Sequence, residues 1–247
     1  MNLAEFYEHH CAAKYAPIAD LLGKHLPVGH GRALELAAGT GLLTRRVAQA
    51  GWDSYIVTDI SPEMLRFAAA QVHKSAITPV EYIRADYAAL PFRAASFDLV
   101  VANLALAHEN QQAIAEIHRV LAPGGWWAAS YWGTGSEAEL IAAARAAVGL
   151  RPMPSISARK VHQYARQAGF ACIEIQTVPV ERNHADAAAF VAHRRVFPVY
   201  GTDGGQAETD AYFESLSQIA FREAPAGPLS LLWQIHLITA QAAPDYF

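Results

Sequence analysis

A glycine-bearing turn, Gly39-Thr40-Gly41, stands between a short apolar run, Ala33–Leu36, and a stretch with apolar residues at helical spacing, Leu42–Ala50. Glycine at such a junction lets ligand atoms approach the backbone closely, and the following helix directs its first N–H groups at the ligand. Glycine pairs between a strand and a helix are common. Taken alone, the turn is explained equally well as an ordinary loop.

An acidic residue at a suitable distance makes the prediction of a ligand-binding turn more specific. Asp59 follows Gly41 by 18 positions (59 − 41) and ends the strand-like run that contains Tyr55–Val57. A carboxylate in that place can accept hydrogen bonds from both ribose hydroxyls of an adenosine-containing cofactor. The competing interpretation is a helix N-cap, but Ser61 before Pro62 already supplies that cap. The spacing therefore predicts a ribose-binding carboxylate at Asp59.

Alternating strand and helix patterns position these residues. Apolar runs predict strands at Ala33–Leu36, Tyr55–Val57, Val80–Arg84, Phe97–Leu104, Trp126–Trp132 and Phe170–Val180. Helical spacing predicts helices at Leu42–Ala50, Pro62–Val72, Gln111–Leu121, Glu137–Val148 and Ala158–Ala168, with Pro123-Gly124-Gly125 ending the third. Repeated β-α-β units of this kind predict an α/β fold with a doubly wound, mostly parallel sheet. Ligands bind such sheets at the carboxyl ends of the strands.

The ends of the chain differ from this repeating core. Residues 1–30 are expected to form an N-terminal helical segment. Residues 183–227 contain two helix-like stretches, about Ala185–Val196 and Glu208–Phe221, before a last strand at Leu229–Thr239. We interpret 183–227 as a small helical insertion that forms a lid over the acceptor within one domain, 1–247.

Four motifs in register resemble the class I S-adenosylmethionine-dependent methyltransferases. The likeness is greatest to the branch that includes the ubiquinone/menaquinone C-methyltransferases and many natural-product methyltransferases. It covers roughly residues 32–132 and rests on the motifs Leu34–Gly41, Thr58–Leu65, Ala85–Phe92 and Phe97–Asn103, followed by Glu116–Gly125. The resemblance implies a Rossmann-like, seven-stranded sheet with helices on both faces, and S-adenosylmethionine as cofactor.

The resemblance also implies roles for individual residues. Glu35 would organise the loop and the methionine ammonium group, while Gly39 and Gly41 pass beneath the cofactor and Asp59 holds the ribose. Ile60 and Met64 would contact the adenine. Asp86, with the Tyr87 backbone, would bind the amino edge of the adenine. Asn103 and Leu104 would line the methionine end beside the reacting methyl group. Tyr15 would bind the methionine carboxylate. Alternatives remain for three of these assignments. Asp86 can be an ordinary turn residue, Asn103 can cap the end of its strand, and one of the tyrosines, Tyr7 or Tyr15, can be a surface aromatic.

Two departures from the family pattern bear on the cofactor. Ala37 stands where the family has its first glycine, and Ala16 follows Tyr15 where the family has aspartate. The chain also lacks the strict G-x-G-x-x-G pattern, which argues against a pyrophosphate and so against a nicotinamide cofactor.

Histidine is the natural residue type for a general base in methyl transfer to a hydroxyl or an activated carbon. His108 follows the fourth predicted strand closely, although it also reads as part of an ordinary helix start. Further candidates for an acceptor pocket are Trp132, His184, His193, Tyr200, Trp233 and His236, each of which has a structural interpretation as well.

Composition limits the classes of partner. The net charge is −4 and the 19 basic residues are scattered, which argues against a nucleic-acid groove. The two isolated cysteines, the lack of a visible signal peptide and the short apolar runs indicate a cytoplasmic protein without a membrane span. No metal is expected, because Asn103–Ala107 at the end of the fourth strand contains no carboxylate and the histidines lack HxxxH spacing. A homodimer stays open.

These observations predict S-adenosylmethionine-dependent methyl transfer to a small, largely apolar or aromatic metabolite, at oxygen, nitrogen or carbon. A protein that binds the same cofactor for another purpose, such as a cyclase or a regulatory subunit, is the main alternative. A nicotinamide-dependent reductase is the other.

Overall fold

The computed structural model describes residues 2–27, 29–72, 77–105, 111–151, 157–195 and 205–244. The chain divides into two compact units. Unit 1 comprises Met1–Tyr131, Ile156–Gln176 and His236–Phe247, and unit 2 comprises Trp132–Ser155 and Thr177–Ile235. The glycine turn and the motifs around it therefore lie in unit 1.

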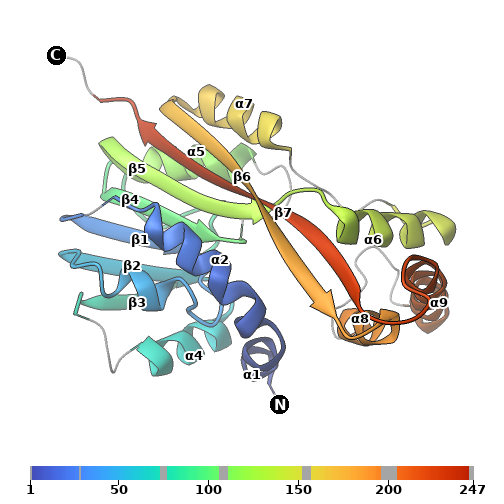
Figure 1. The fold of residues 1–247 in the computed structure, drawn as a ribbon. Helices are drawn as coiled ribbons and strands as arrows, with labels where there is room; N and C mark the ends of the chain where they lie inside the picture. The colour runs from blue at the N-terminus through green and yellow to red at the C-terminus, as the bar shows by residue number, and fades with distance from the viewer. Residues whose placement is uncertain are drawn as a thin grey trace. The chain divides into compact units, whose positions relative to one another are not determined.

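One seven-stranded sheet forms the centre of the fold (Figure 1). Its strand order is β3-β2-β1-β4-β5-β7-β6, and β3, β2, β1, β4 and β5 pair in parallel. Because β7 runs opposite to its neighbours in Figure 1, the sheet is mixed. The predicted seven-stranded α/β sheet is confirmed, with β1 at Arg32–Leu36, β2 at Ser54–Asp59, β3 at Val80–Arg84, β4 at Phe97–Asn103, β5 at Leu121–Trp132, β6 at Phe170–His184 and β7 at Leu229–Ala242.

Helices connect these strands. In the described part of unit 1 they are α1 (Leu3–Tyr7), the π-helical turn η1 (Glu8–Ala12), α2 (Ala13–Lys24), α3 (Thr44–Val47), α4 (Pro62–Val72), α5 (Gln111–Val120) and α7 (Ala158–Ala168). In the described part of unit 2 they are α6 (Ser136–Ala147), α8 (Ala187–Arg195) and α9 (Gln206–Glu223). Helices α8 and α9 lie between β6 and β7 in sequence, where the insertion was expected.

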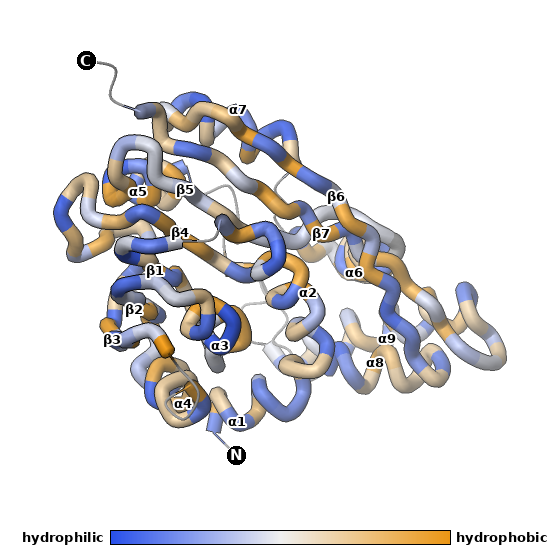
Figure 2. The backbone as a smooth tube through the Cα atoms, turned by 60° about the vertical axis from the view of Figure 1, so that its left-hand side comes forward, coloured by the Kyte–Doolittle hydropathy of each residue, from blue (hydrophilic) through white to orange (hydrophobic). Residues whose placement is uncertain are grey.

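Along each strand, successive side chains point to opposite faces of the sheet. Leu34 and Val100 face one side, where they join a buried cluster with Ile114 and Ile117 of α5 and Val161 of α7. Residues of opposite parity, such as Glu35, face the other side, which is the side of Tyr55 and of Thr44 at the start of α3. The inner strands are hydrophobic over much of their length (Figure 2). The clearest case is β4, which is buried and apolar at every position from Leu99 to Ala102.

The strand order reverses between β1 and β4. The chain passes from β1 outward to β2 and β3, and then returns to place β4 on the other side of β1. Leu36 pairs with Ala102, so the residues that follow each strand emerge next to each other. This is the position at which open α/β sheets bind their ligands.

Several element boundaries differ from the predictions, and two of the differences have a clear local cause. Helix α3 is four residues long, because N–H groups at both ends bond in the tighter i→i+3 pattern, as from Arg46 to Leu43 and from Ala50 to Val47. Strand β5 begins at Leu121, so Pro123-Gly124-Gly125 lies within it. The chain bulges there, since the register with β4 shifts between Phe97 and Leu99.

An ion pair on α5 fixes the loop that follows β3. The Arg119 guanidinium donates to the carbonyl oxygens of Phe92 and Leu90, at 2.8 and 3.0 Å, and to the Glu116 carboxylate. Glu116 in turn accepts the Leu90 N–H at 2.9 Å. The Arg119 interaction lowers the pKa of Glu116. The pair therefore holds the segment that carries Asp86.

Arg119→Met should loosen this loop. We expect a loss of about 1–3 kcal/mol in the free energy of unfolding, because two backbone carbonyls and a carboxylate lose a charged donor. Amide hydrogen exchange should accelerate in residues 86–92. Arg46→Met is the control, since the Arg46–Asp20 pair is exposed and should contribute less than about 1 kcal/mol. Equal effects of the two substitutions would contradict the assignment.

Candidate functional site

The Asp59 carboxylate at the end of β2 joins the two loops that follow β1 and β2. One oxygen accepts the Gly39 N–H at 2.9 Å, and the other accepts the Ser61 N–H at 2.8 Å. Ser61 Oγ caps α4 by accepting the Met64 N–H at 3.3 Å, so the predicted cap is confirmed. Each Asp59 oxygen retains a lone pair, because a carboxylate has about four acceptor positions. Two hydroxyl groups can still bind.

The glycine turn offers open space at one glycine and none at the other. Gly39 has φ +56°, and a Cβ built on it would meet nothing within 4 Å. Gly41 has φ +86°, and its Cβ would lie 3.0 Å from that of Ala68 on α4. Gly41 thus permits close packing of α4, whereas Gly39 presents bare backbone to a ligand.

Ala37 adopts φ +48°, a left-handed conformation that costs a non-glycine residue about 1–2 kcal/mol. This explains why glycine suits the position in the family pattern. Alanine keeps the same backbone shape here, since the Ala38 N–H donates to the Thr58 carbonyl at 2.9 Å.

Glu35 lies beneath the turn and is almost completely buried. Its Oε2 accepts hydrogen bonds from Thr44 Oγ1 at 2.7 Å and from the Tyr55 hydroxyl at 2.5 Å. Burial raises the pKa of Glu35 to about 7, although both hydrogen bonds act in the other direction. Glu35 therefore ties the start of α3 to β2, as expected of a residue that organises the loop. Its contact with the methionine ammonium group stays a prediction.

The residues expected at the adenine lie after β2 and β3. Ile60 is 60% exposed, and its carbonyl accepts Arg84 Nε at 2.9 Å. Met64 is half-buried in the first turn of α4. Asp86 Oδ1 accepts the Ala88 N–H at 2.8 Å, which is the geometry of the turn-residue alternative.

Tyr87, beside Asp86, is partly buried and packs against the core cluster on the α5 face of the sheet. The adenine roles of Ile60, Met64, Asp86 and Tyr87 stay predictions.

The N-terminal helices bring two tyrosines toward this region. The rings of Tyr7 and Tyr15 lie 6.0 Å apart. The pKa of the Tyr7 hydroxyl is raised, first by burial and then by Tyr15, Cys11 and the Asp59 charge. Tyr7 is therefore electrostatically coupled to the predicted ribose-binding residue. Sequence reasoning chose Tyr15, and the role of Tyr15 at the methionine carboxylate stays a prediction.

Sequence reasoning missed an ion pair beside the turn. Arg45 Nη2 donates to Glu8 Oε1 at 2.8 Å and to the Thr40 carbonyl at 3.4 Å. Glu8 lies in the π-helical turn η1, a distortion that often accompanies functional sites. The pair connects the N-terminal segment to the glycine turn. The 37 positions that separate the two residues give no local sequence signal.

Asn103 is the last residue of β4, on the other side of the switch in strand order, and Leu104 follows it. Leu104 has φ +54°, which costs a branched side chain about 1–2 kcal/mol. The Asn103 side chain bonds to Ser130 on β5, so the strand-end alternative also has a structural basis. His108, the candidate base, lies outside the described residues, and so does Tyr200.

The remaining acceptor-site candidates fall in both units. In unit 2 the rings of Trp132 and Trp233 lie 4.8 Å apart, and those of His184 and His193 lie 5.9 Å apart. His236 belongs to unit 1, packs on Tyr131, and has its pKa lowered by burial. Their roles toward an acceptor stay predictions.

Two searches within the described ranges concern metals and membranes. Among these residues, no group of three or more histidine, cysteine or acidic side chains is placed to hold a metal ion. None of the helices described here combines the length and the apolar character that a membrane span requires.

Comparison with known proteins agrees with the geometry of unit 1. Residues 34–129 match a family model described as a methyltransferase domain. Over 172 residues the chain is 32% identical to a malonyl-[acyl-carrier protein] O-methyltransferase of Methylococcus capsulatus, covering 68% of this chain and 62% of that protein. A ubiquinone/menaquinone biosynthesis C-methyltransferase, UbiE of Pseudoalteromonas translucida, is 31% identical over 136 residues, which are 47% of this chain and 54% of the relative.

The chain thus spans less than two thirds of the length of these curated relatives. The likeness of fold is wider. The YcgJ protein of Bacillus subtilis superposes with a TM-score of 0.67 at 16% identity, over 93% of this chain and 99% of that one.

The raised pKa of Glu35 gives a pH dependence to stability. Between pH 4.5 and about 7 the folded protein holds a proton that the unfolded chain releases, so stability falls as pH rises. The fall should be at most about 3 kcal/mol, since one pKa unit corresponds to about 1.4 kcal/mol.

Denaturant unfolding of the cofactor-free protein across this range measures the effect. Glu35→Gln keeps an acceptor for Thr44 and should remove this part of the slope. An unchanged slope in the variant would show that Glu35 is ionised at pH 5 in the folded state.

The two glycines should respond differently to alanine. Gly41→Ala meets Ala68 as well as backbone strain, so we expect a loss of about 1–3 kcal/mol in stability. Gly39→Ala meets strain alone, and its methyl group would occupy the open space above the turn. Thermal unfolding and calorimetric titration with S-adenosylmethionine separate these effects. Gly39→Ala should lose more affinity and Gly41→Ala more stability, and the reverse order would refute the assignment.

Proposed function

We propose that this chain, which carries a domain of the class I S-adenosylmethionine-dependent methyltransferases in the branch that includes UbiE, transfers a methyl group from S-adenosylmethionine to a small, largely apolar or aromatic metabolite. The attacking atom of the acceptor is oxygen, nitrogen or carbon. The observation that carries the proposal is the Asp59 carboxylate, which joins the glycine turn to β2 and keeps two acceptor positions.

The residues around Asp59 fit an adenosine-containing cofactor. The space over Gly39 is open, so the ligand can lie against backbone without meeting a side chain. Ile60 leaves a large apolar surface exposed beside Asp59, and an adenine ring would bury part of it. The turn contains no phosphate-binding G-x-G-x-x-G pattern, which fits a cofactor without phosphate groups.

Bound S-adenosylmethionine supplies a methyl group on a sulfonium, which is already an activated electrophile. The residues of the chain then have to hold the cofactor, align the acceptor and exclude water. Asp59 would fix the ribose, and Glu35 would hold the turn through Thr44 and Tyr55. We keep His108 as the proposed general base for acceptors that must lose a proton.

Two observations support this acceptor class. By their names, the two curated relatives are a malonyl-[acyl-carrier protein] O-methyltransferase and a ubiquinone/menaquinone biosynthesis C-methyltransferase. In unit 2 the Trp132 and Trp233 rings lie 4.8 Å apart, and α8 and α9 pack aromatic residues into a buried apolar cluster. We propose that segment 183–227, which contains α8 and α9, forms a lid over the acceptor.

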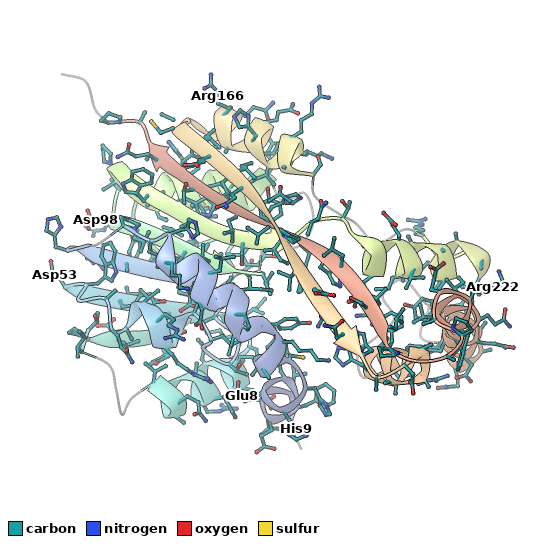
Figure 3. All side chains as sticks on the ribbon, in the orientation of Figure 1. Glu8, His9, Asp53, Asp98, Arg166 and Arg222 are labelled. Atoms are coloured by element: carbon teal, nitrogen blue, oxygen red, sulfur yellow. The ribbon has the colours of Figure 1, made fainter. Side chains whose placement is uncertain are left out.

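Asp59→Asn tests the cofactor site. The variant removes the charge and one acceptor oxygen, and we expect S-adenosylmethionine affinity to fall about 10- to 100-fold in calorimetry. Asp98→Asn is the matched control, since Asp98 accepts the Arg32 N–H at 2.8 Å, at the edge where the strands begin (Figure 3). Both variants should lose stability, but only Asp59→Asn should lose affinity. Equal affinities would exclude Asp59 as a cofactor ligand.

Methyl transfer itself is tested with methyl-labelled S-adenosylmethionine and a metabolite extract. Labelled products that depend on the protein, and that disappear with Asp59→Asn, are expected. Tight binding without any labelled product would favour the alternative of a cofactor-binding protein with another activity.

A further inference from the structure

Ser130 on β5 forms a hydrogen bond with the side chain of Asn103, the last residue of β4. Ser130 pairs with Asn103 in the parallel register of these strands and is completely buried. Its Oγ donates to Asn103 Oδ1 at 2.8 Å. The same Oγ accepts the Leu104 N–H at 3.0 Å, and the Ser130 carbonyl accepts it at 2.9 Å. One hydroxyl thus connects the side chain of Asn103 to the backbone of Leu104.

These bonds determine which way the Asn103 amide faces. A hydroxyl has one hydrogen to donate. Ser130 Oγ donates that hydrogen to Asn103 Oδ1 while it accepts the Leu104 N–H, so the amide oxygen of Asn103 faces Ser130. The amide nitrogen of the half-buried Asn103 therefore faces away from Ser130, and within the described residues it donates to no protein atom.

The position of Asn103 along the sheet edge points to a ligand. Asp86, Asp59 and Ala37 follow β3, β2 and β1, which are neighbours in that order, and Asn103 ends β4, the next strand. Neighbouring strands are about 4.8 Å apart. A cofactor with its adenosine at β3 and β2 and its amino-acid end at the β1 turn reaches β4 with its terminal groups.

We infer that Ser130 is a positioning residue that holds the Asn103 amide as a fixed N–H donor for the α-carboxylate at the amino-acid end of the cofactor. The inference rests on the proposed function, since it requires an S-adenosylmethionine site at these strand ends. A neutral donor with a set direction suits a carboxylate, because hydrogen bonds to a charged acceptor are the strong ones. No proton transfer is involved.

The left-handed conformation of Leu104 belongs to the same arrangement. A branched residue seldom adopts φ +54°, and strained residues cluster at ligand sites. The two bonds from Leu104 N–H to Ser130 hold this conformation. Ala37, across the switch in strand order, is strained in the same sense. Backbone in two unusual conformations thus borders the place where the amino-acid end of the cofactor is expected.

Two ligands separate this role from a structural one. S-adenosylhomocysteine carries the amino-acid end, whereas 5′-methylthioadenosine has the same adenosine and thioether without it. Asn103→Asp keeps an oxygen for Ser130 but replaces the donor with a carboxylate oxygen. We expect it to weaken S-adenosylhomocysteine more than tenfold, and 5′-methylthioadenosine less than twofold, in calorimetric titrations. Ser130→Ala should lower the ratio of the two affinities about five- to tenfold.

A double-mutant cycle tests the dependence on Asn103. In an Asn103→Ala background, Ser130→Ala should leave the affinity ratio unchanged, because the donor that it orients is gone. Thr58→Val is the matched control. It removes a buried bond from Thr58 Oγ1 to the Glu35 carbonyl, 2.7 Å long, and should lower stability without changing the ratio.

Several outcomes would overturn the inference. Equal losses for both ligands in Ser130→Ala would mean a structural role alone. A ratio effect that persists in Asn103→Ala would mean that Ser130 acts without Asn103. If the variants bind both ligands like the wild type, the cofactor site stands and this assignment fails. If the wild-type protein binds neither ligand, the proposed function fails together with it.

Discussion

The hydrogen bonds of the Asp59 carboxylate are the interaction on which the site depends. Asp59 ends β2, yet it accepts the N–H of Gly39 in the turn after β1 and the N–H of Ser61 before α4. A nearly buried carboxylate has to be hydrogen-bonded, and here both partners are backbone groups of the loops that follow β1 and β2. The position of the glycine turn and the availability of the carboxylate are therefore linked. A ligand that binds to Asp59 meets a turn that is already in place.

Of the four non-glycine residues with positive φ in the described part of the chain, two flank the switch in strand order. Ala37 follows β1 and Leu104 follows β4, and both are left-handed although neither is glycine. Each is held by hydrogen bonds from a neighbouring strand, through Thr58 on β2 and Ser130 on β5. The interior of the sheet thus supplies the free energy that keeps the ligand-facing backbone in unfavourable conformations. This is how a rigid scaffold preorganises a site.

Glu35 adds an electrostatic element to the same scaffold. A carboxyl group with a pKa of about 7 is partly protonated near neutral pH, and its hydrogen-bonding partners are Thr44 at the start of α3 and Tyr55 on β2. A positively charged ligand group above the turn would favour the ionised form. The protonation of Glu35 and its hydrogen bonds beneath the turn are therefore coupled. Separately, the ion pair of Arg45 with Glu8 connects the turn to the N-terminal segment.

The sequence alone determined the features that depend on near neighbours in the chain. Strand β3 and helices α4 and α7 lie where periodicity, Ser61, Pro62 and Gly169 predict them, and the spacing of Gly41 and Asp59 indicated a cofactor turn. Only the tertiary structure decided which distant groups meet. Asn103 bonds to Ser130, 27 positions away, and Arg45 to Glu8, 37 positions away. The physical reason is that capping and periodicity act over a few residues, whereas these contacts exist only after strand order and register bring separate elements together.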